Sequence, residues 1–570
     1  MSASIPAPPS FQTRIQALAK TPLFQPRELL PGITSYEEQR QISLQRTFAI
    51  GKAMAPSLET VQNLPDEWWH IHSDPIFSVD GASYVLLSIQ LNLIVQTLST
   101  YLDKQPGLKP LIDQLLQFDI MGQFCLSEVD HGLDARNIET IVTRLPNGDL
   151  ILHTPHPGAS KYMPPSAPRG IPGVGLVFAR LIVDGEDRGI RGFVVPISDG
   201  QKTYTGITVR VLGGRPGTKP VEHCITTFNN VRLPKSALLG SLDKPENERR
   251  HFQELIWAVA CGAIVFAAPV ITCLRISAYI ASTYSQRRTV AGHGKGSPRV
   301  PIISFKTQYR PVLIAIAHAH VLKALYWSTA RFFRDLSNPM ELRHAMATIL
   351  KLLVQRTVQE DMFVLSERCG GQGLMGYNQI AAFCDEMRGS ATAEGDAVVL
   401  SLRLIAELVI GRYDLPEPKD SNNILYKHEQ GLFAETREAI SQIKHHRSDL
   451  FNRLVLPRCE KMTMSIGHRV AYEAGVAAGL SPQLTDLYLA SAVRTDEGWY
   501  SEKMGYSRES QFRAEDDALQ AALPFLKQWT EELDVKEYAW APILSDEKWA
   551  EFFNSREVAP CYGDSVKSKL

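Results

Sequence analysis

The sequence has no excess of charge of either sign, because 60 lysines and arginines stand against 61 aspartates and glutamates in 570 residues. A nucleic-acid-binding protein uses basic charge to replace the cations around the phosphates, so this function class is disfavoured. Hydrophobic residues make up 44% and charged residues 21%, which argues against a fibrous or disordered chain. At roughly 150 residues per domain, the length predicts about three to four domains.

Signatures of disulfide scaffolds and zinc sites are also lacking. No C-x-x-C pair occurs among the eight cysteines. The pairs His70/His72 and His318/His320 do not have the i, i+4 spacing that directs two imidazoles at one metal ion. We therefore expect no metal site. The start, MSASIPAPPSF, lacks the basic and apolar regions of a secretory signal, so a reducing interior compartment is expected.

One long hydrophobic run has the length of a membrane span. Residues 255–274, LIWAVACGAIVFAAPVITCL, carry no charge. The run is rich in small residues, contains Pro269 and continues into a further helical pattern, as a helix buried in a bundle does. We found no second segment of this kind and predict a buried core helix, with no membrane span.

The hydrophobic period changes twice along the chain. It is helical at first, then alternates in short runs joined by turns such as Asn147-Gly148, and is helical again afterwards. The pattern predicts a multi-domain α+β fold. Its parts are an N-terminal α-helical domain (1–120), a β-domain (121–240), an α-helical bundle (241–415), a C-terminal α-helical domain (424–555) and a tail (556–570).

The tail ends in Ser568-Lys569-Leu570. A terminal S-K-L is the address that the peroxisomal import receptor reads, and the alternative is a chance tripeptide in a polar tail. We expect a peroxisomal protein with that receptor as a partner.

A glycine-rich loop, Gly370-Gly371-Gln372-Gly373-Leu374-Met375-Gly376, contains a formal G-x-G-x-x-G. The loop follows a predicted helix instead of a strand, so the dinucleotide-binding motif of a Rossmann fold is disfavoured. A glycine-rich helix terminus and a close backbone approach to a phosphate both stay open.

The segment GSATAEGDAVVL contains two carboxylates just before an apolar helix. Asp396 is well placed to cap that helix, which leaves Glu394 without a structural task. If an apolar ligand covered Glu394, burial would raise its pKa toward the range in which a carboxylate removes a weakly acidic proton. The alternative is a carboxylate that only favours the helix dipole.

Several segments between residues 80 and 412 resemble, in order, the acyl-CoA oxidase and acyl-CoA dehydrogenase superfamily, and more closely its fungal-type peroxisomal oxidases. GQFCLSEVDHGLDARNIET (122–140) is similar to the flavin segment of the family, and FNNVRLPKSALLG (228–240) to the exit from its β-domain. YSQRRTV (284–290) is similar to the segment whose arginine reaches the FAD of a neighbouring subunit, and ERCGGQG (367–373) to the glycine segment beside that FAD. TAEGD (392–396) matches the E-G motif of the catalytic base.

The resemblance implies the site residues. Glu394 takes the position of the catalytic base, Ser127 that of the hydroxyl that bonds the isoalloxazine, and Arg287 that of the arginine on the partner's FAD pyrophosphate. A homodimer or higher homo-oligomer follows from this last role. The residues implied in FAD binding are Phe124, Leu126, Ser127, Gly132, Met163, Arg287, Gly370, Gly371 and Asp396.

The resemblance also implies the acyl-CoA dehydrogenase-like fold, in which the central domain is an antiparallel β-barrel-like unit. The implied reaction is the FAD-dependent α,β-dehydrogenation of an acyl-CoA to the trans-2-enoyl thioester, as in the β-oxidation of fatty acids. A peroxisomal member is expected to pass the electrons to molecular oxygen and release hydrogen peroxide, whereas a dehydrogenase uses an electron-transferring flavoprotein.

Four departures from the family pattern keep two alternatives open. Tyr162-Met163-Pro164-Pro165 stands where the oxidases have Trp-Trp-Pro-Gly, Ala393 replaces an aromatic residue before the base, Val290 replaces a Phe, and Leu133 replaces a small polar residue. One alternative is a flavoenzyme of the same fold acting on a specialised thioester or a nitrogen-bearing small molecule. The other is a flavin-free, non-catalytic binding or scaffold protein.

Overall fold

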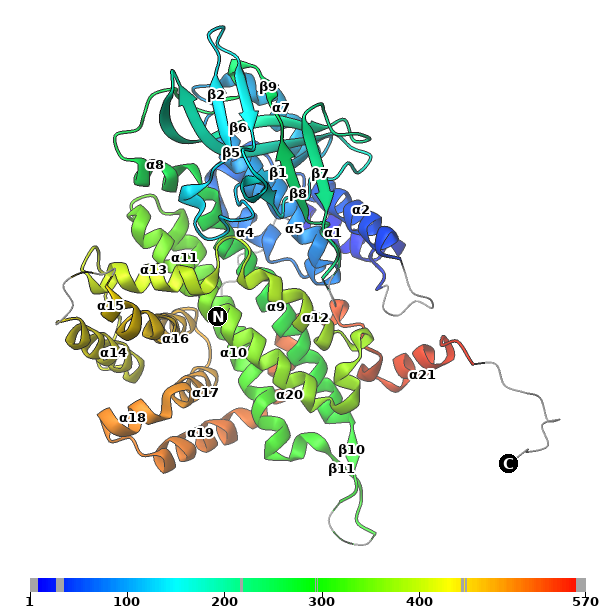
Figure 1. The fold of residues 1–570 in the computed structure, drawn as a ribbon. Helices are drawn as coiled ribbons and strands as arrows, with labels where there is room; N and C mark the ends of the chain where they lie inside the picture. The colour runs from blue at the N-terminus through cyan, green and yellow to red at the C-terminus, as the bar shows by residue number, and fades with distance from the viewer. Residues whose placement is uncertain are drawn as a thin grey trace, which may run out of the picture.

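A computed structural model describes residues 9–26, 35–215, 219–292, 294, 296–441, 445 and 448–559. Helices, then strands, then helices follow one another along the chain, as the changes of hydrophobic period predict (Figure 1). Most strands gather at one end of the molecule and the long helices form a bundle below them, while a short two-stranded hairpin (289–290 and 300–301) lies at the opposite end of the bundle. The multi-domain α+β fold class is confirmed. Ser568-Lys569-Leu570 lies outside the described residues.

The N-terminal helices pack beside the strands and against the bundle. Buried Asp80 starts one of them, because its carboxylate accepts the backbone N–H of Ser83 at 3.0 Å and the guanidinium of Arg46 at 3.0 Å. The helix continues through a π-helical segment, η4 (Ile89–Val95). The α-helices of this part are α1 (Pro9–Ala19), α2 (Tyr36–Met54), α3 (Leu58–Asn63), α4 (Asp66–His72), α5 (Gly81–Ser88), α6 (Gln96–Ser99) and α7 (Lys109–Leu116).

The β-domain consists of a six-stranded sheet with the path β1-β5-β2-β3-β9, to which β6 adds on β5, and a three-stranded sheet in the order β4-β8-β7. Most pairs are antiparallel. The β5–β6 hairpin turns at Asp184 and Gly185, both with positive φ, which suits the right-handed twist of the strands. The strands are β1 (Met121–Cys125), β2 (Ile141–Arg144), β3 (Leu150–His153), β4 (Lys161–Tyr162), β5 (Gly173–Val183), β6 (Glu186–Ser198), β7 (Ile207–Val211), β8 (Cys224–Phe228) and β9 (Val231–Leu233).

Two strand pairs depart from the implied antiparallel arrangement. β1 and β2 each run parallel to β5. A parallel pair needs a long crossover, and the segments that separate β1 and β2 from β5 supply it. The sheet is therefore mixed at β5.

The bundle is built around α9, whose sequence includes the uncharged run 255–274 except for its first two residues. The prediction of a buried core helix is confirmed, because 89% of its most apolar window is buried. By length and composition, however, 81–99 and 306–334 are also apolar enough to cross a membrane, so the expectation of a single such segment was wrong. These two are 83% and 72% buried inside the fold. The bundle elements are α8 (Glu248–Leu255), α9 (Trp257–Arg287), β10 (Thr289–Val290), β11 (Val300–Pro301), α10 (Lys306–Arg334), α11 (Met340–Arg368), α12 (Ile380–Met387) and α13 (Ala397–Val409).

The last helices pack onto this bundle. Arg275 of α9 donates to the carbonyl of Leu533 at 3.0 Å, and residues 471–543 contribute to the same hydrophobic core as α9 and α10. The helices are α14 (Ile424–Ile440), α15 (Asp449–Leu454), α16 (Cys459–Ala477), α17 (Pro482–Val493), α18 (Glu497–Met504), α19 (Arg508–Ala522), α20 (Leu526–Glu532) and α21 (Asp546–Asn554).

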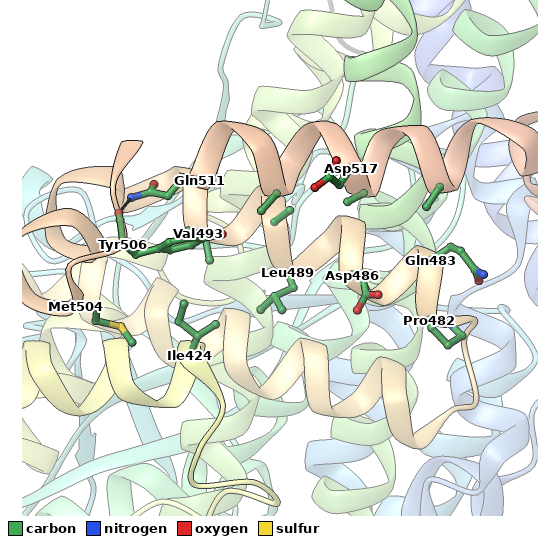
Figure 2. Close-up of a pocket in the computed structure, with 14 residues that line it drawn as sticks. Ile424, Pro482, Gln483, Asp486, Leu489, Val493, Met504, Tyr506, Gln511 and Asp517 are labelled. Atoms are coloured by element: carbon green, nitrogen blue, oxygen red, sulfur yellow. Dashed lines mark hydrogen bonds between the residues drawn. The ribbon is translucent and has the colours of Figure 1, made fainter. Parts of the chain in front are cut away.

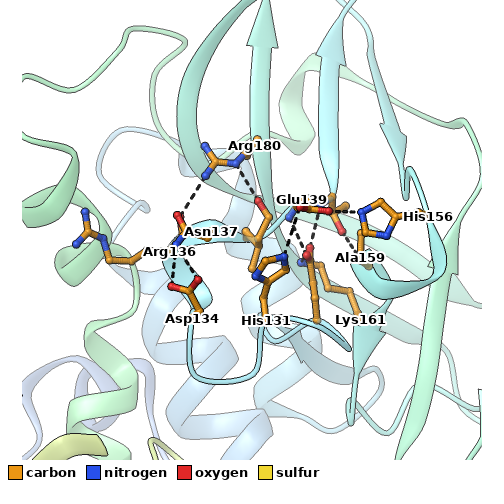
Figure 3. A network of polar contacts seen from close by, with 12 residues as sticks. His131, Asp134, Arg136, Asn137, Glu139, His156, Ala159, Lys161 and Arg180 are labelled. Carbon is orange, nitrogen blue, oxygen red and sulfur yellow. Dashed lines mark hydrogen bonds and ion pairs between the residues drawn. The ribbon is translucent and has the colours of Figure 1, made fainter. Parts of the chain in front are cut away.

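A polar network closes the loop between β1 and β2 (Figure 3). The carboxylate of Glu128 accepts the backbone N–H groups of Glu139 at 2.7 Å and Thr140 at 2.9 Å, and pairs with the ammonium of Lys161 at 2.8 Å. Both charged side chains of this pair are fully buried. Arg180 supports the loop from β5 by donating to the carbonyl of Ile138 at 2.9 Å. The two ends of the loop are thereby tied together.

We expect Lys161→Met to destabilise the protein by about 3–5 kcal/mol, because it leaves the Glu128 charge buried without its partner. The loss is measured as the apparent free energy of unfolding in urea. Arg232→Met is the matched control: it breaks the exposed pair with Asp149 in the same domain and should cost about 1 kcal/mol or less. Equal losses in the two variants would contradict the assignment of Lys161 as the partner that balances a buried charge.

Candidate functional site

Two cavities of similar size, each about 740 Å³, are candidates for the site. One lies among α14, α17 and α19 at the far side of the bundle (Figure 2). Its walls are mostly apolar, with the carboxylates of Asp486 and Asp517 on facing helices. None of its lining residues is one that the sequence predicts for the site.

The other cavity lies between the β-domain, the N-terminal helices and the bundle, and it collects most of the predicted site residues. Its volume is in the range of about 300–1,000 Å³ that small-molecule sites occupy. Arg287, Gly370 and Gly371 do not line it. The predicted residues that line it are Phe124, Leu126, Ser127, Gly132, Met163, Glu394 and Asp396.

Glu394 reaches this cavity from a turn in which two consecutive residues have positive φ, 56° at Glu394 and 91° at Gly395. A left-handed conformation costs a non-glycine residue about 1–2 kcal/mol, so the surrounding structure must hold it. Asp396 ends the turn and caps α13, because its Oδ1 accepts the N–H groups of Val398 at 3.0 Å and Val399 at 3.1 Å. The predicted cap is confirmed.

The carboxyl of Glu394 is packed against α9 at Gly262. A Cβ added at Gly262 would lie 2.5 Å from both Cδ and Oε2 of Glu394, so the absence of a side chain there makes room for the carboxyl. Oε2 is buried and has no hydrogen-bond partner among the described residues. A buried oxygen without a partner costs free energy, and such oxygens occur at catalytic sites.

Burial raises the pKa of Glu394 to about 8, against the opposing effect of the Lys351 ammonium. A carboxylate of ordinary pKa is too weak a base for a carbon acid, and the environment of this one makes it a stronger base. The sequence analysis named burial of Glu394 as the condition for removing a weakly acidic proton, and the surroundings of the carboxyl meet this condition.

Lys351 is a residue of this site that the sequence analysis missed. It lies in the middle of α11, is 1% exposed, and its ammonium donates to the carbonyls of Ala393 and Gly395 on either side of Glu394. Burial lowers the pKa of Lys351 to about 8, while Glu394 and Asp396 favour its charge. The signal that could have found it is a single charge inside the apolar run of residues 349–354, ILKLLV.

The β-domain wall of the cavity combines apolar side chains with the hydroxyl of Ser127 and the phenol of Tyr162. Ser127 and Tyr162 lie side by side, because the carbonyl of Ser127 accepts the N–H of Tyr162 at 2.9 Å. Met163 has a φ of 77° and is held by its N–H, which donates to the carbonyl of Cys224 at 2.9 Å. Phe124 packs on Phe178 with ring centroids 4.8 Å apart. Met163 is thus held in the cavity wall by its backbone hydrogen bond, and Phe124 by its contact with Phe178.

Positive charge collects at the part of the cavity formed by α8 and α13. The carboxylate oxygen Oε1 of Glu407 pairs with Arg249 at 2.5 Å, Arg412 at 3.1 Å and Arg403 at 3.3 Å. Arg136 of the β1–β2 loop also lines the cavity and acts electrostatically on Arg249. One carboxylate is therefore paired with three partly exposed guanidinium groups, and the cavity lining also carries the carboxylates of Asp134 and Glu341.

Arg287 lies at the opposite end of α9 from Gly262. It donates to the carbonyl of Ile543 at 3.0 Å and pairs with Asp546, both within its own chain. Nearby, Gln308 links Ser285 of α9 to the carbonyl of Arg368, just before Gly370 and Gly371. These predicted residues form a separate group, and their role toward a partner's cofactor stays a prediction.

Among the described residues there is no group of three or more His, Cys, Asp or Glu side chains that could hold a metal ion.

Comparison with known proteins points to one family. A family model for the acyl-CoA oxidase C-alpha1 domain matches residues 263–409. Acyl-coenzyme A oxidase acox-1.1 of Caenorhabditis elegans is 24% identical over 69% of this chain and 59% of its own length. Peroxisomal acyl-coenzyme A oxidase 1 of Arabidopsis thaliana is 27% identical over 50% of this chain and 46% of its own. The matches thus span less than two thirds of these relatives.

A solved structure extends the likeness in fold. Acyl-CoA oxidase-2 of Caenorhabditis elegans, described as bound with FAD, ascaroside-CoA and ATP, superposes with a TM-score of 0.79 over 96% of this chain and 90% of that chain, at 17% identity. The matched family model covers Glu394, Gly395 and Lys351. In sequence and in fold, the chain is thus similar to acyl-CoA oxidases, which supports the resemblance to the oxidase branch of the superfamily.

Proposed function

We propose that this protein is an FAD-dependent acyl-CoA oxidase. It converts an acyl-CoA and O₂ into the trans-2-enoyl-CoA and H₂O₂, with Glu394 as the base that removes the α-proton. The observation that carries the proposal is the Glu394 carboxyl at a cavity of about 740 Å³, with its Oε2 buried and without a hydrogen-bond partner among the described residues.

The residues at this cavity fit an FAD. Opposite the bundle, the β-domain offers an apolar wall with Phe124, Leu126 and Met163, and the hydroxyl of Ser127 adds a hydrogen-bonding group for a flat heteroaromatic ring. We assign Gly132 and Asp396 to the same site. When bound, the flavin supplies the hydride acceptor that no amino-acid side chain provides.

The chain itself supplies the base and a site sheltered from water. An α-proton next to a thioester is weakly acidic, so its removal needs a carboxylate that is poorly solvated and a donor for the developing enolate oxygen. Burial weakens the solvation of Glu394, and we assign its backbone N–H, as the family resemblance implies, to the enolate oxygen. The small side chain of Ala393 widens the space next to the base.

The cationic group of Arg249, Arg403 and Arg412 is assigned to the CoA part of the substrate. Its guanidinium groups outnumber the single carboxylate of Glu407, and phosphates are the anions that paired guanidinium groups bind best. The thioester would then reach from these arginines to Glu394 within one cavity.

We further assign the protein to the peroxisome and to a homodimer or higher homo-oligomer. The location is supported by the name of the Arabidopsis thaliana relative. The oligomer is supported by Arg287, Gly370 and Gly371, which lie away from the cavity and which the family resemblance assigns to a partner's FAD.

Glu394→Gln is expected to lower the rate of acyl-CoA oxidation by about 10²–10⁴-fold, because it removes the general base while keeping the size of the side chain. The measurements are oxygen consumption and the loss of visible flavin absorbance on anaerobic addition of acyl-CoA. Glu509→Gln, on an exposed helix pair with Arg513, is the control and should leave both unchanged. A protein that stays colourless with FAD would overturn the flavoenzyme, and flavin reduction without oxygen consumption would overturn the oxidase.

The pH dependence follows from the raised pKa of Glu394, which is about 8. The base acts only when ionised, so kcat/KM should rise with pH and level off above this value, falling about tenfold per pH unit on the acid side. Initial rates at subsaturating acyl-CoA test this. A profile that is already level from about pH 5 upward would contradict a desolvated base.

Arg249→Ala should raise KM for acyl-CoA roughly fivefold with kcat little changed, because it removes about 1 kcal/mol of binding shared by ground and transition states. The matched control is the acyl-pantetheine thioester, which lacks the nucleotide phosphates and should show the same KM with both proteins. An equal rise for both substrates would refute the phosphate assignment.

A further inference from the structure

Lys351 carries a charged group in the least favourable environment of α11. Its neighbours Leu350, Leu352 and Leu353 are fully buried, and Lys351 itself is 1% exposed. An ammonium in such a place must be compensated by hydrogen bonds and opposite charge, or it costs several kcal/mol. Among the described residues, the compensating hydrogen bonds and opposite charges come from the loop that carries the proposed base.

Lys351 holds the backbone of that loop by hydrogen bonds on both sides of Glu394. The carbonyls of Ala393 and Gly395 both accept from its Nζ atom, and Glu394 lies between them. Glu394 has positive φ, so its backbone is in a conformation that a side-chain-bearing residue rarely adopts unless it is held. A second anchor lies one turn further along α11, where Gln355 accepts from Ser390 at 3.0 Å.

The electrostatic surroundings of Lys351 are simple. Among the described residues, the charges that act on its ammonium are Glu394 and Asp396, both from the loop before α13. Around the Glu394 carboxyl, α5 contributes the phenol of Tyr84 and α9 the thiol of Cys261. Burial raises the pKa of both the phenol and the thiol, which keeps them neutral. Lys351 is thus the positive charge that opposes the effect of burial on Glu394.

We propose that Lys351 is the positioning residue of the base: its ammonium clamps the two carbonyls that flank Glu394 and supplies the positive charge that lets the buried carboxylate ionise. The inference rests on the proposed function, in which Glu394 removes the α-proton. Lys351 has two tasks in this proposal: its hydrogen bonds orient Glu394, and its charge favours the ionised form of the Glu394 carboxyl.

Two variants of Lys351 separate these tasks. Lys351→Gln keeps an amide that can donate to the carbonyls but removes the charge, whereas Lys351→Met removes both. In both neutral variants, the acid limb of the plot of kcat/KM against pH should shift to higher pH by about one unit or more. Activity near neutral pH should then fall roughly tenfold. Lys351→Met should also lower the plateau at high pH, while KM stays close to that of the parent. Lys351→Arg keeps the charge and should restore the acid limb.

A second readout is independent of turnover. The carbonyl band of the protonated Glu394 carboxyl, identified by its loss in Glu394→Gln, is followed against pH by infrared difference spectroscopy of the protein without substrate. Its midpoint should rise in both neutral variants by the same shift as the activity limb. Lys306→Gln is the matched control, since it removes a lysine charge paired with Asp516 on the bundle surface and should shift neither readout.

The inference is overturned if Lys351→Gln and Lys351→Met keep the parental midpoint and the parental acid limb, whatever their stability. If Lys351→Met does not fold, Lys351→Gln and Lys351→Arg decide the question alone, because they differ in charge and both can donate hydrogen bonds. If the parent protein oxidises no acyl-CoA while the infrared midpoint still moves, the proposed function fails and the coupling of Lys351 to Glu394 stands.

Discussion

The structure around the central cavity has to offset the free energy that is lost when the carboxyl group of Glu394 is removed from water. Glu394 has an oxygen that is buried and unpartnered, and burial raises its pKa to about 8. Three features make this arrangement possible: the missing side chain at Gly262, the ammonium of Lys351 and the helix cap formed by Asp396. Each comes from a different segment, so the carboxyl depends on the packing of α9, α11 and α13 together.

The distribution of charge along the cavity fits the proposed acyl-CoA substrate, which has two different ends. Guanidinium groups gather around Glu407, whereas the region between Glu394 and the β-domain is mainly apolar. An anionic carrier with an apolar acyl group has this same polarity. The second cavity, with Asp486 and Asp517 on facing helices, offers carboxylates among mostly apolar walls and no such complementarity to phosphates.

The departures from the family pattern affect the walls of the cavity more than its base. Met163 and Tyr162 replace the expected aromatic pair, yet their backbone is fixed by hydrogen bonds to Cys224 and Ser127. Ala393 changes the shape next to Glu394, and its carbonyl still accepts the hydrogen bond that the Lys351 ammonium donates. In a binding or scaffold protein without chemistry, the buried and unpartnered Oε2 of Glu394 would destabilise the fold without serving a function. Under the proposed function, the substitutions therefore bear on which acyl group fits.

The sequence alone was sufficient for features that depend on neighbouring residues. The changes of hydrophobic period predicted the order of helices and strands, the uncharged run 255–274 predicted a buried helix, and Asp396 predicted a helix cap. These features arise within a few turns of chain, so local pattern carries them. Glu394 was recognisable because the cap left it without a local task.

The tertiary structure decided the features that join distant segments. Lys351 meets the loop of Glu394 across 42 and 44 residues, Gly262 makes room for the carboxyl from another helix, and the arginines around Glu407 come from both α8 and the region of α13. The parallel pairing of β1 and β2 with β5 likewise depends on long crossovers. No local period encodes such contacts, because they form only when the helices and sheets pack and bury their charges against one another.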